Sequence, residues 1–178
     1  IDATCPLVSR VHRTAERHFK SGRKIVMIGH EGHPETAGTM GQLPAGVMPL
    51  IQTASDAKNL VANSDEELTY VTQTTLSVDE TAEIVSTLRS RFSHLVEPEK
   101  EDICYATTNR QKAIKNIAPK CNKMFVLGAA NSSNSKRLVE VAKLSGCENS
   151  VLIKDSSQIN WTTIKDGETI GISAGASA

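Results

Sequence analysis

The sequence predicts an α/β protein made of two similar units, each containing a parallel β-sheet. The first observation is an internal repeat: two segments align without a gap at an offset of 99 residues, so that Cys5 matches Cys104. The second is the regular alternation of short apolar runs with stretches of helical character. Strands that alternate with helices in this way are typical of α/β units with right-handed crossovers.

The composition excludes several classes of protein. The 178 residues are 39% hydrophobic and 22% charged, and the formal net charge is +0. A balanced charge argues against a polycationic nucleic-acid arm and a basic membrane patch. Because only 3% of the residues are aromatic, stacking platforms for single-stranded nucleic acid are mostly absent. No apolar run approaches the ~20 residues of a membrane span, so we expect a cytoplasmic protein without a nucleic-acid or membrane partner.

The repeat also predicts the domain organisation. Residues 24–29 match residues 123–128 position for position, and a charged, proline-containing stretch at 97–102 separates the two copies. We therefore expect one α/β domain over residues 1–100 and a second over residues 101–178.

Short apolar runs are expected to form strands that are buried on both faces of parallel sheets. They lie at 24–28, 48–52, 68–72, 123–127, 150–153 and 168–172. Helices are expected between them, including those at 9–19, 108–118 and 136–145. Ser77 with Glu80, and Thr108 with Gln111, have capping-box spacing. Gly146 is well placed to end the helix that precedes it.

The carboxyl ends of these strands are the expected location of the functional site. In open parallel sheets, ligands bind there because loops converge and helix N-termini point towards the ligand. Polar loops fall at this position in both predicted units, at 29–36, 72–77, 128–135 and 173–177.

The first of these loops contains His30, His33 and Glu35 within a few residues of a strand. Histidine and carboxylate side chains at this spacing suit acid–base catalysis or metal ligation. A surface turn is the alternative, because Gly29 and Pro34 also favour turns. The position directly after an apolar strand favours function. The hydroxyls of 72–75 suit orientation of a substrate hydroxyl, although threonine also ends strands and caps helices.

Two further loops are candidate anion sites. Small hydroxyl and amide side chains at 131–135 precede a helix, and free backbone N–H groups at a helix start bind anions. The segment 173–177 is similar, and Gly175 permits close approach of the backbone. A simple helix-capping loop is the alternative reading. Two such loops in one sheet favour phosphate or diphosphate binding.

The cysteines fall into two groups. Cys5 and Cys104 are equivalent in the repeat, whereas Cys121 and Cys147 have no cysteine at the matching offset. The first pair is therefore a candidate ligand pair. An iron–sulfur site generally needs three or four thiolates, so two would require a further cysteine.

The motifs resemble those of the LytB/IspH family of 4-hydroxy-3-methylbut-2-enyl diphosphate reductases, in the same order along the whole chain. They are DATCPLV (2–8), GHEGHPE (29–35), TQTTLS (72–77), DICYATTNRQ (102–111), NSSNS (131–135) and AGAS (174–177). The resemblance implies a three-lobed α/β trefoil around a central 4Fe-4S cluster. It implies reductive removal of an allylic hydroxyl to give isopentenyl and dimethylallyl diphosphates, the last step of the methylerythritol phosphate pathway, with ferredoxin or flavodoxin as electron donor.

The resemblance also implies roles for individual residues. Cys5 and Cys104 would be two of three cluster ligands. Glu35 would donate a proton, and Thr74 would orient the substrate hydroxyl. Residues that would hold the substrate are His33, Thr74, Ser132, Ser133, Asn134 and Ser177. A carboxylic acid can donate protons here if burial near the diphosphate charge raises its pKa.

Relative to the family pattern, the first lobe, with its cysteine, and the carboxyl-terminal tail are expected outside these residues. We expect roughly 90 further residues before Ile1, with one more cysteine, given the length of the repeat. The 178-residue piece alone is then expected to hold no complete cluster and to be inactive. Two alternatives remain from the residues themselves: a thiol hydrolase or amidotransferase using a cysteine with His33 and Glu35, and a non-catalytic phosphate-binding module.

Overall fold

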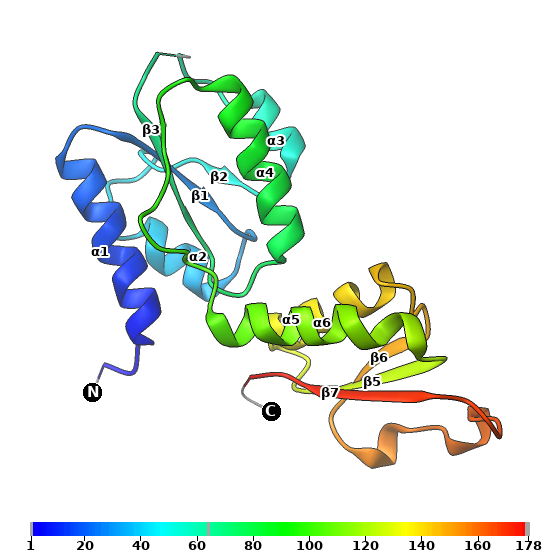
Figure 1. The fold of residues 1–178 in the computed structure, drawn as a ribbon. Helices are drawn as coiled ribbons and strands as arrows, with labels where there is room; N and C mark the ends of the chain where they lie inside the picture. The colour runs from blue at the N-terminus through cyan, green and yellow to red at the C-terminus, as the bar shows by residue number, and fades with distance from the viewer. Residues whose placement is uncertain (1, 64, 177–178) are drawn as a thin grey trace. The chain divides into compact units, whose positions relative to one another are not determined.

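The structure is a computed structural model, and it describes residues 2–63 and 65–176. The chain forms two compact units, Ile1–Cys104 and Tyr105–Ala178. Each unit contains a parallel sheet with helices packed against it (Figure 1).

The first unit has a four-stranded sheet in the order β2-β1-β3-β4, with every neighbouring pair parallel. Its strands are β1 (Lys24–Ile28), β2 (Leu50–Ile51), β3 (Leu68–Thr72) and β4 (Leu95–Val96). Its helices are α1 (Pro6–Lys20), α2 (Pro34–Met40), α3 (Ala54–Asn59) and α4 (Val78–Arg91). β1 and β3 pair along their full length, so that Ile28 and Thr72 end side by side.

Helices cover both faces of this sheet, because successive strand residues point to opposite sides. Val26 packs in a buried cluster that includes Leu88 of α4, whereas Ile25 and Met27 pack in another that includes Val11 of α1. Figure 1 shows α1 on one side of the sheet and α3 with α4 on the other. The near-continuous apolar character of these strands follows from burial on both faces.

The second unit has a three-stranded parallel sheet in the order β6-β5-β7. Its strands are β5 (Lys123–Leu127), β6 (Ser150–Ile153) and β7 (Ile170–Ala174). Its helices are α5 (Tyr105–Ile117) and α6 (Ser133–Leu144), with three short 3-10 segments, η1 (Ala118–Lys120), η2 (Ser156–Gln158) and η3 (Trp161–Thr163). The two sheets place the repeat-related strands β1 and β5 at equivalent central positions, as the repeat predicts.

Only one face of the second sheet carries a well-buried core within the described residues. Met124 and Val126 pack in a cluster with residues of α5 and α6. On the other face, Val151 and Ile172 flank Phe125 in register and are 45% and 69% exposed. The expectation that both sheets are covered on both faces is therefore wrong for this face in the chain as described.

The predicted α/β class with parallel sheets is confirmed, and four predicted strands match the structure residue for residue. The run at 48–52 is shorter, since β2 has only two residues, and the run at 168–172 is shifted to Ile170–Ala174. β4 was not predicted. It pairs with β3 through only Leu95 and Val96, which is too short to give a periodic signal.

The helix ends test the capping predictions. Ser77 is the N-cap of α4, and its side chain accepts a hydrogen bond from the backbone N–H of Glu80. The predicted cap at Thr108 is wrong, because α5 already begins at Tyr105 and Thr108 lies inside it. Gly146 follows the C-cap of α6 with φ of 104°, a conformation that favours glycine.

None of the helices in the described part of the chain combines the length and the apolar character needed to cross a membrane.

Candidate active site

A carboxylate and a threonine meet at the carboxyl ends of β1 and β3. The Glu35 Oε1 atom accepts a hydrogen bond of 2.7 Å from the backbone N–H of Thr74, and Oε2 accepts one of 3.0 Å from the Thr74 hydroxyl. Glu35 lies in the first turn of α2, and Thr74 lies just beyond β3. The loops 29–36 and 72–77 therefore converge here, as the sheet topology predicts.

The pKa of the Glu35 carboxyl lies above the ordinary value for a glutamate. Burial raises the pKa of Glu35, and the charge of Asp102 acts in the same direction, while the two hydrogen bonds from Thr74 lower it. The net direction is upward. A buried acid that holds its proton more tightly than an ordinary glutamate can act as a proton donor.

His33 contributes a neutral donor beside this acid. It is the N-cap of α2, and its Nδ1 atom accepts a hydrogen bond of 3.2 Å from the backbone N–H of Glu35. Burial lowers the pKa of His33, and His30 lowers it further. A neutral ring whose Nδ1 atom accepts must carry its hydrogen on Nε2. His33 can therefore donate from Nε2 to an anion.

Gln73, whose role was not predicted from the sequence, links the loops 29–36 and 72–77 by hydrogen bonds. It is fully buried, and its Oε1 atom accepts hydrogen bonds from the His30 backbone N–H (3.0 Å) and the Thr36 hydroxyl (3.2 Å). Gly29 makes this contact possible, because a Cβ there would lie 2.7 Å from the Thr36 Oγ1 atom. The arrangement holds Glu35 against Thr74.

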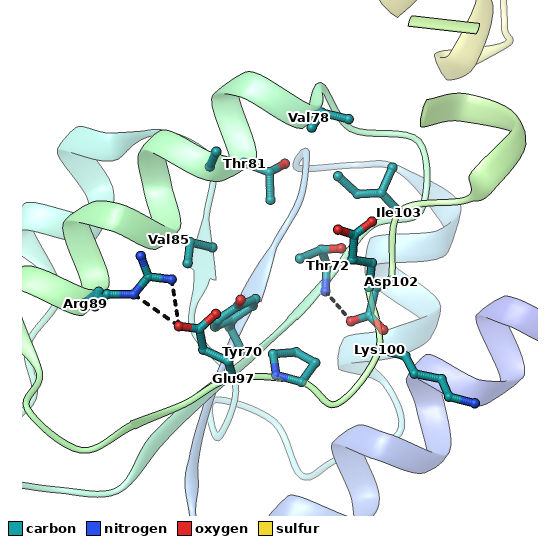
Figure 2. Close-up of a pocket in the computed structure, with 13 residues that line it drawn as sticks. Tyr70, Thr72, Val78, Thr81, Val85, Arg89, Glu97, Lys100, Asp102 and Ile103 are labelled. Atoms are coloured by element: carbon teal, nitrogen blue, oxygen red, sulfur yellow. Dashed lines mark hydrogen bonds and ion pairs between the residues drawn. The ribbon is translucent and has the colours of Figure 1, made fainter. Parts of the chain in front are cut away.

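Asp102 joins the segments that carry the two candidate thiols. Its buried carboxylate accepts a hydrogen bond of 3.1 Å from the Thr72 backbone N–H (Figure 2). The same carboxylate forms an ion pair with the Arg10 guanidinium at 3.3 Å. Arg10 lies on α1, whose N-cap is Cys5. Asp102 stands two residues before Cys104, whose backbone N–H donates to the Thr74 carbonyl at 2.9 Å. Neither Asp102 nor Arg10 was singled out from the sequence, because a lone acid or base in a charged stretch resembles any surface residue.

The second unit builds an equivalent loop from smaller side chains. Ser132 is the N-cap of α6 and accepts hydrogen bonds from the backbone N–H (3.3 Å) and hydroxyl (3.0 Å) of Ser135. Ser135 lies between two glycines: a Cβ at Gly128 or at Gly175 would approach its Oγ atom to 2.2 Å. Because Gly175 has no side chain, the segment after β7 can pack closely against Ser135 at the start of α6; its predicted role in anion binding stays a prediction.

Asn134, in the first turn of α6, has an amide group without a hydrogen-bond partner among the described residues. The residue is 7% exposed, and both polar atoms of its amide are buried without a hydrogen-bond partner in the described residues. Buried polar groups are normally paired, so a ligand with donors and acceptors would satisfy them. Ser133, in the same turn, is half-buried. Ser177 lies outside the described residues.

The four cysteines are free thiols in different environments. Cys5 is exposed and precedes α1, and Cys104 is half-buried and precedes α5. Cys147 is buried in the apolar core, and burial raises the pKa of Cys121. Cys5 and Cys104 thus stand at equivalent positions, each directly before the first residue of a helix.

These two thiols fit part of an iron–sulfur site. Such clusters are held by cysteine thiolates, and both candidate thiols lie on segments that Asp102 joins. Within the residues that the structure describes, no group of three or more histidine, cysteine, aspartate or glutamate side chains is arranged to hold a metal ion.

These features define a class: an α/β protein with two units related by an internal repeat, each with a parallel sheet, the first of which carries a buried acid at its strand ends. The chain belongs to the LytB protein family, whose model matches residues 1–178.

Curated relatives agree along the whole chain. A 4-hydroxy-3-methylbut-2-enyl diphosphate reductase from Roseobacter denitrificans is 55% identical over 178 residues, covering 100% of this chain and 56% of the relative. A protein of the same name from Gluconobacter oxydans is 56% identical over 182 residues, covering 100% of this chain and 54% of the relative. The chain therefore spans about half the length of the curated relatives that it matches.

Two solved structures also match over the whole of this chain. The structure of E-1-hydroxy-2-methyl-but-2-enyl-4-diphosphate reductase from Plasmodium falciparum matches with a TM-score of 0.94 and 36% identity, covering 100% of this chain and 55% of that one. A structure of (E)-4-hydroxy-3-methyl-but-2-enyl diphosphate reductase matches with a TM-score of 0.59 and 30% identity, covering 100% of this chain and 62% of that one.

Proposed function

We propose that the whole protein containing this chain is a 4-hydroxy-3-methylbut-2-enyl diphosphate reductase, located in the cytoplasm. It catalyses the last step of the methylerythritol phosphate pathway of isoprenoid biosynthesis. The reaction breaks the bond between the allylic carbon and its hydroxyl oxygen. Two electrons and two protons are consumed, the oxygen leaves as water, and a new C–H bond gives isopentenyl or dimethylallyl diphosphate.

In this proposal, residues 1–100 and 101–178 are the second and third lobes of a trefoil. A 4Fe-4S cluster, bound by Cys5, Cys104 and one further cysteine, supplies the electrons and a Lewis-acidic iron, both of which side chains lack. Ferredoxin or flavodoxin delivers the electrons. With two of the three thiolates, the 178-residue chain alone is expected to hold no complete cluster and to be inactive.

The hydrogen-bonded pair of Glu35 and Thr74 carries the proposal. The bond of 3.0 Å between the Thr74 hydroxyl and the Glu35 Oε2 atom lets the hydroxyl orient a substrate oxygen beside the acid. Because its pKa is raised by burial, Glu35 retains a proton at higher pH than an exposed glutamate. Glu35 thus holds the proton that the departing hydroxyl requires to leave as water.

The diphosphate is assigned to neutral donors and helix starts. His33 donates from Nε2 at the start of α2, while Ser132, Ser133 and Asn134 lie at the start of α6, and Ser177 is proposed to assist them. The positive ends of helix dipoles complement phosphate charge. The unpartnered amide of Asn134 supports this assignment.

The proposal is tested with Glu35→Gln in the full-length protein, purified without oxygen and loaded with its cluster. Glu31, exposed in the same loop, provides the matched control variant Glu31→Gln. Removing a catalytic proton donor is expected to lower kcat by about 10²–10⁴-fold with little change in substrate binding. Glu31→Gln should retain activity. Full turnover by Glu35→Gln would contradict the assigned role.

A further inference from the structure

Arg110 joins the end of β7 to the first turn of α5 in the second unit. Its Nε atom donates to the Ala174 carbonyl at 3.1 Å, and its Nη1 atom donates to the Ala106 carbonyl at 3.2 Å. Ala174 is the last residue of β7, and Ala106 lies in the first turn of α5. Because a guanidinium carries its donors in a rigid plane, Arg110 holds the two carbonyls in a fixed arrangement.

The Ala174 carbonyl is open to this bond because β7 lies at the edge of the three-stranded sheet. The Gly175 N–H, which belongs to the same peptide group, donates to the Leu127 carbonyl of β5 at 2.9 Å. In a trans peptide the C=O and N–H groups point in opposite directions, and the described residues contain no cis peptide bond. The Ala174 carbonyl therefore points away from β5, and Arg110 supplies the partner that the sheet does not.

The peptide that Arg110 holds lies beside the candidate anion site. A Cβ at Gly175 would lie 3.7 Å from the Asn134 Nδ2 atom and 2.2 Å from the Ser135 Oγ atom. Asn134 and Ser135 are both in the first turn of α6. A displacement of the peptide between Ala174 and Gly175 would therefore change the surroundings of the Asn134 amide, which is assigned to the diphosphate.

We propose that Arg110 is a positioning residue for the diphosphate. By bonding the Ala174 carbonyl, it fixes the following peptide against the start of α6 before the ligand arrives. Binding then does not have to order this segment, and such preorganisation strengthens binding. Arg110 acts through the backbone and does not itself contact the substrate. The inference rests on the proposed function, because it concerns the same diphosphate site.

Binding of inorganic pyrophosphate to the full-length protein, loaded with its cluster, tests the proposal by calorimetry. Arg110→Met keeps a side chain of similar length without donors, and its Kd is expected to be about tenfold higher than in wild type. Arg110→Lys keeps the charge but not the planar set of donors, and it should bind about three- to tenfold more weakly than wild type. Lys112→Met, exposed on the same helix, removes the same charge and should bind like wild type.

Two further measurements separate positioning from a general structural role. In steady-state kinetics, Arg110→Met should raise KM and leave kcat nearly unchanged, because the acid Glu35 is untouched. Amide hydrogen exchange should become faster at Gly175 in Arg110→Met but stay the same at Ile172, in the middle of β7.

The outcomes distinguish this inference from the function on which it rests. If wild type does not bind pyrophosphate, the proposed diphosphate site itself is contradicted. If wild type binds and Arg110→Met binds equally well, only the role of Arg110 is overturned. An equal loss in Lys112→Met, or wild-type affinity in Arg110→Lys, would also overturn it, because charge alone would then explain the effect. So would a lower Tm in Arg110→Met with an unchanged Kd.

Discussion

Thr74 donates both its backbone N–H and its hydroxyl to the carboxylate of Glu35, at 2.7 Å and 3.0 Å. The two residues are 39 positions apart and reach each other because β1 and β3 are parallel neighbours whose carboxyl ends coincide. Both hydrogen bonds favour the charged carboxylate, whereas burial favours the neutral acid. The raised pKa of Glu35 shows that burial has the larger effect.

The first prediction concerns this balance. Thr74→Val removes the hydroxyl but keeps the backbone N–H, so one interaction that lowers the pKa of Glu35 is lost and the pKa rises further. Thr74→Ser retains the hydroxyl and should leave the pKa near the wild-type value. The measurement is NMR titration of the Glu35 carboxyl carbon in the cluster-free full-length protein. A pKa for Thr74→Val at or below the wild-type value would contradict the prediction.

A second prediction follows from the packing of Ser135 between two glycines. Gly175→Ala places a Cβ 2.2 Å from the Ser135 Oγ atom but 3.4 Å from its Cβ. We expect a loss of about 1–3 kcal/mol in the free energy of unfolding, as for other overpacked sites. Adding Ser135→Ala removes the close atom and should restore most of the loss. Denaturant unfolding of the full-length protein measures both.

Gly128→Ala provides the internal control for this rescue. The new Cβ lies 2.6 Å from the Ser135 Cβ as well as 2.2 Å from Oγ. Ser135→Ala keeps that Cβ and should therefore restore little. A failure of Ser135→Ala to restore stability in Gly175→Ala would show that crowding by the Ser135 Oγ atom is not the cause.

A third prediction separates ligand binding from stability at Asn134. Because neither polar atom of its amide has a partner within the described residues, Asn134→Leu should leave the free energy of unfolding unchanged or raise it. Loss of hydrogen bonds to a charged diphosphate should raise KM about 10- to 100-fold, since such bonds contribute roughly 1.5–3 kcal/mol. Steady-state kinetics and thermal unfolding together check it. Lower stability with an unchanged KM would indicate a purely structural residue.

The fourth prediction concerns Asp102 as a positioning residue. Asp102→Ala leaves the buried Thr72 N–H and the side chain of Arg10 without their shared acceptor, which is expected to cost about 1–3 kcal/mol. The segments that carry Cys5 and Cys104 should then loosen, so both thiols react faster with iodoacetamide in the cluster-free protein. Glu101→Gln, next in sequence and exposed, is the control. Unchanged thiol reactivity in Asp102→Ala would refute the positioning role.

Much of the fold could be predicted from the sequence because its signals are local. The central strands are continuous apolar runs. Ser77 as the N-cap of α4 and Gly146 after the end of α6 could be predicted because both depend on local backbone chemistry. β4 was missed because two residues carry no periodicity. Thr108 was misassigned as a cap because its spacing to Gln111 also occurs inside a helix, where α5 places both.

The candidate site, too, could be predicted from the sequence only in part. Glu35 and Thr74 were placed in loops after strands, and the parallel register brings those loops together. The roles of Gln73 and Asp102 could not be predicted, because each depends on contacts across the sheet that no local pattern encodes. The close packing of Ser135 against Gly128 and Gly175, which follow different strands, is likewise a property of the tertiary structure.

The central claim is that Cys5 and Cys104 bind one iron–sulfur cluster, and metal analysis of cysteine variants tests it most directly. Iron and sulfide are measured, with electron paramagnetic resonance of the reduced protein, in full-length wild type, Cys5→Ala, Cys104→Ala and the control Cys121→Ala. The account predicts about four iron atoms per chain in wild type and control, as a 4Fe-4S cluster requires, and loss of the intact cluster in the other two. A complete cluster in either Cys5→Ala or Cys104→Ala would contradict it.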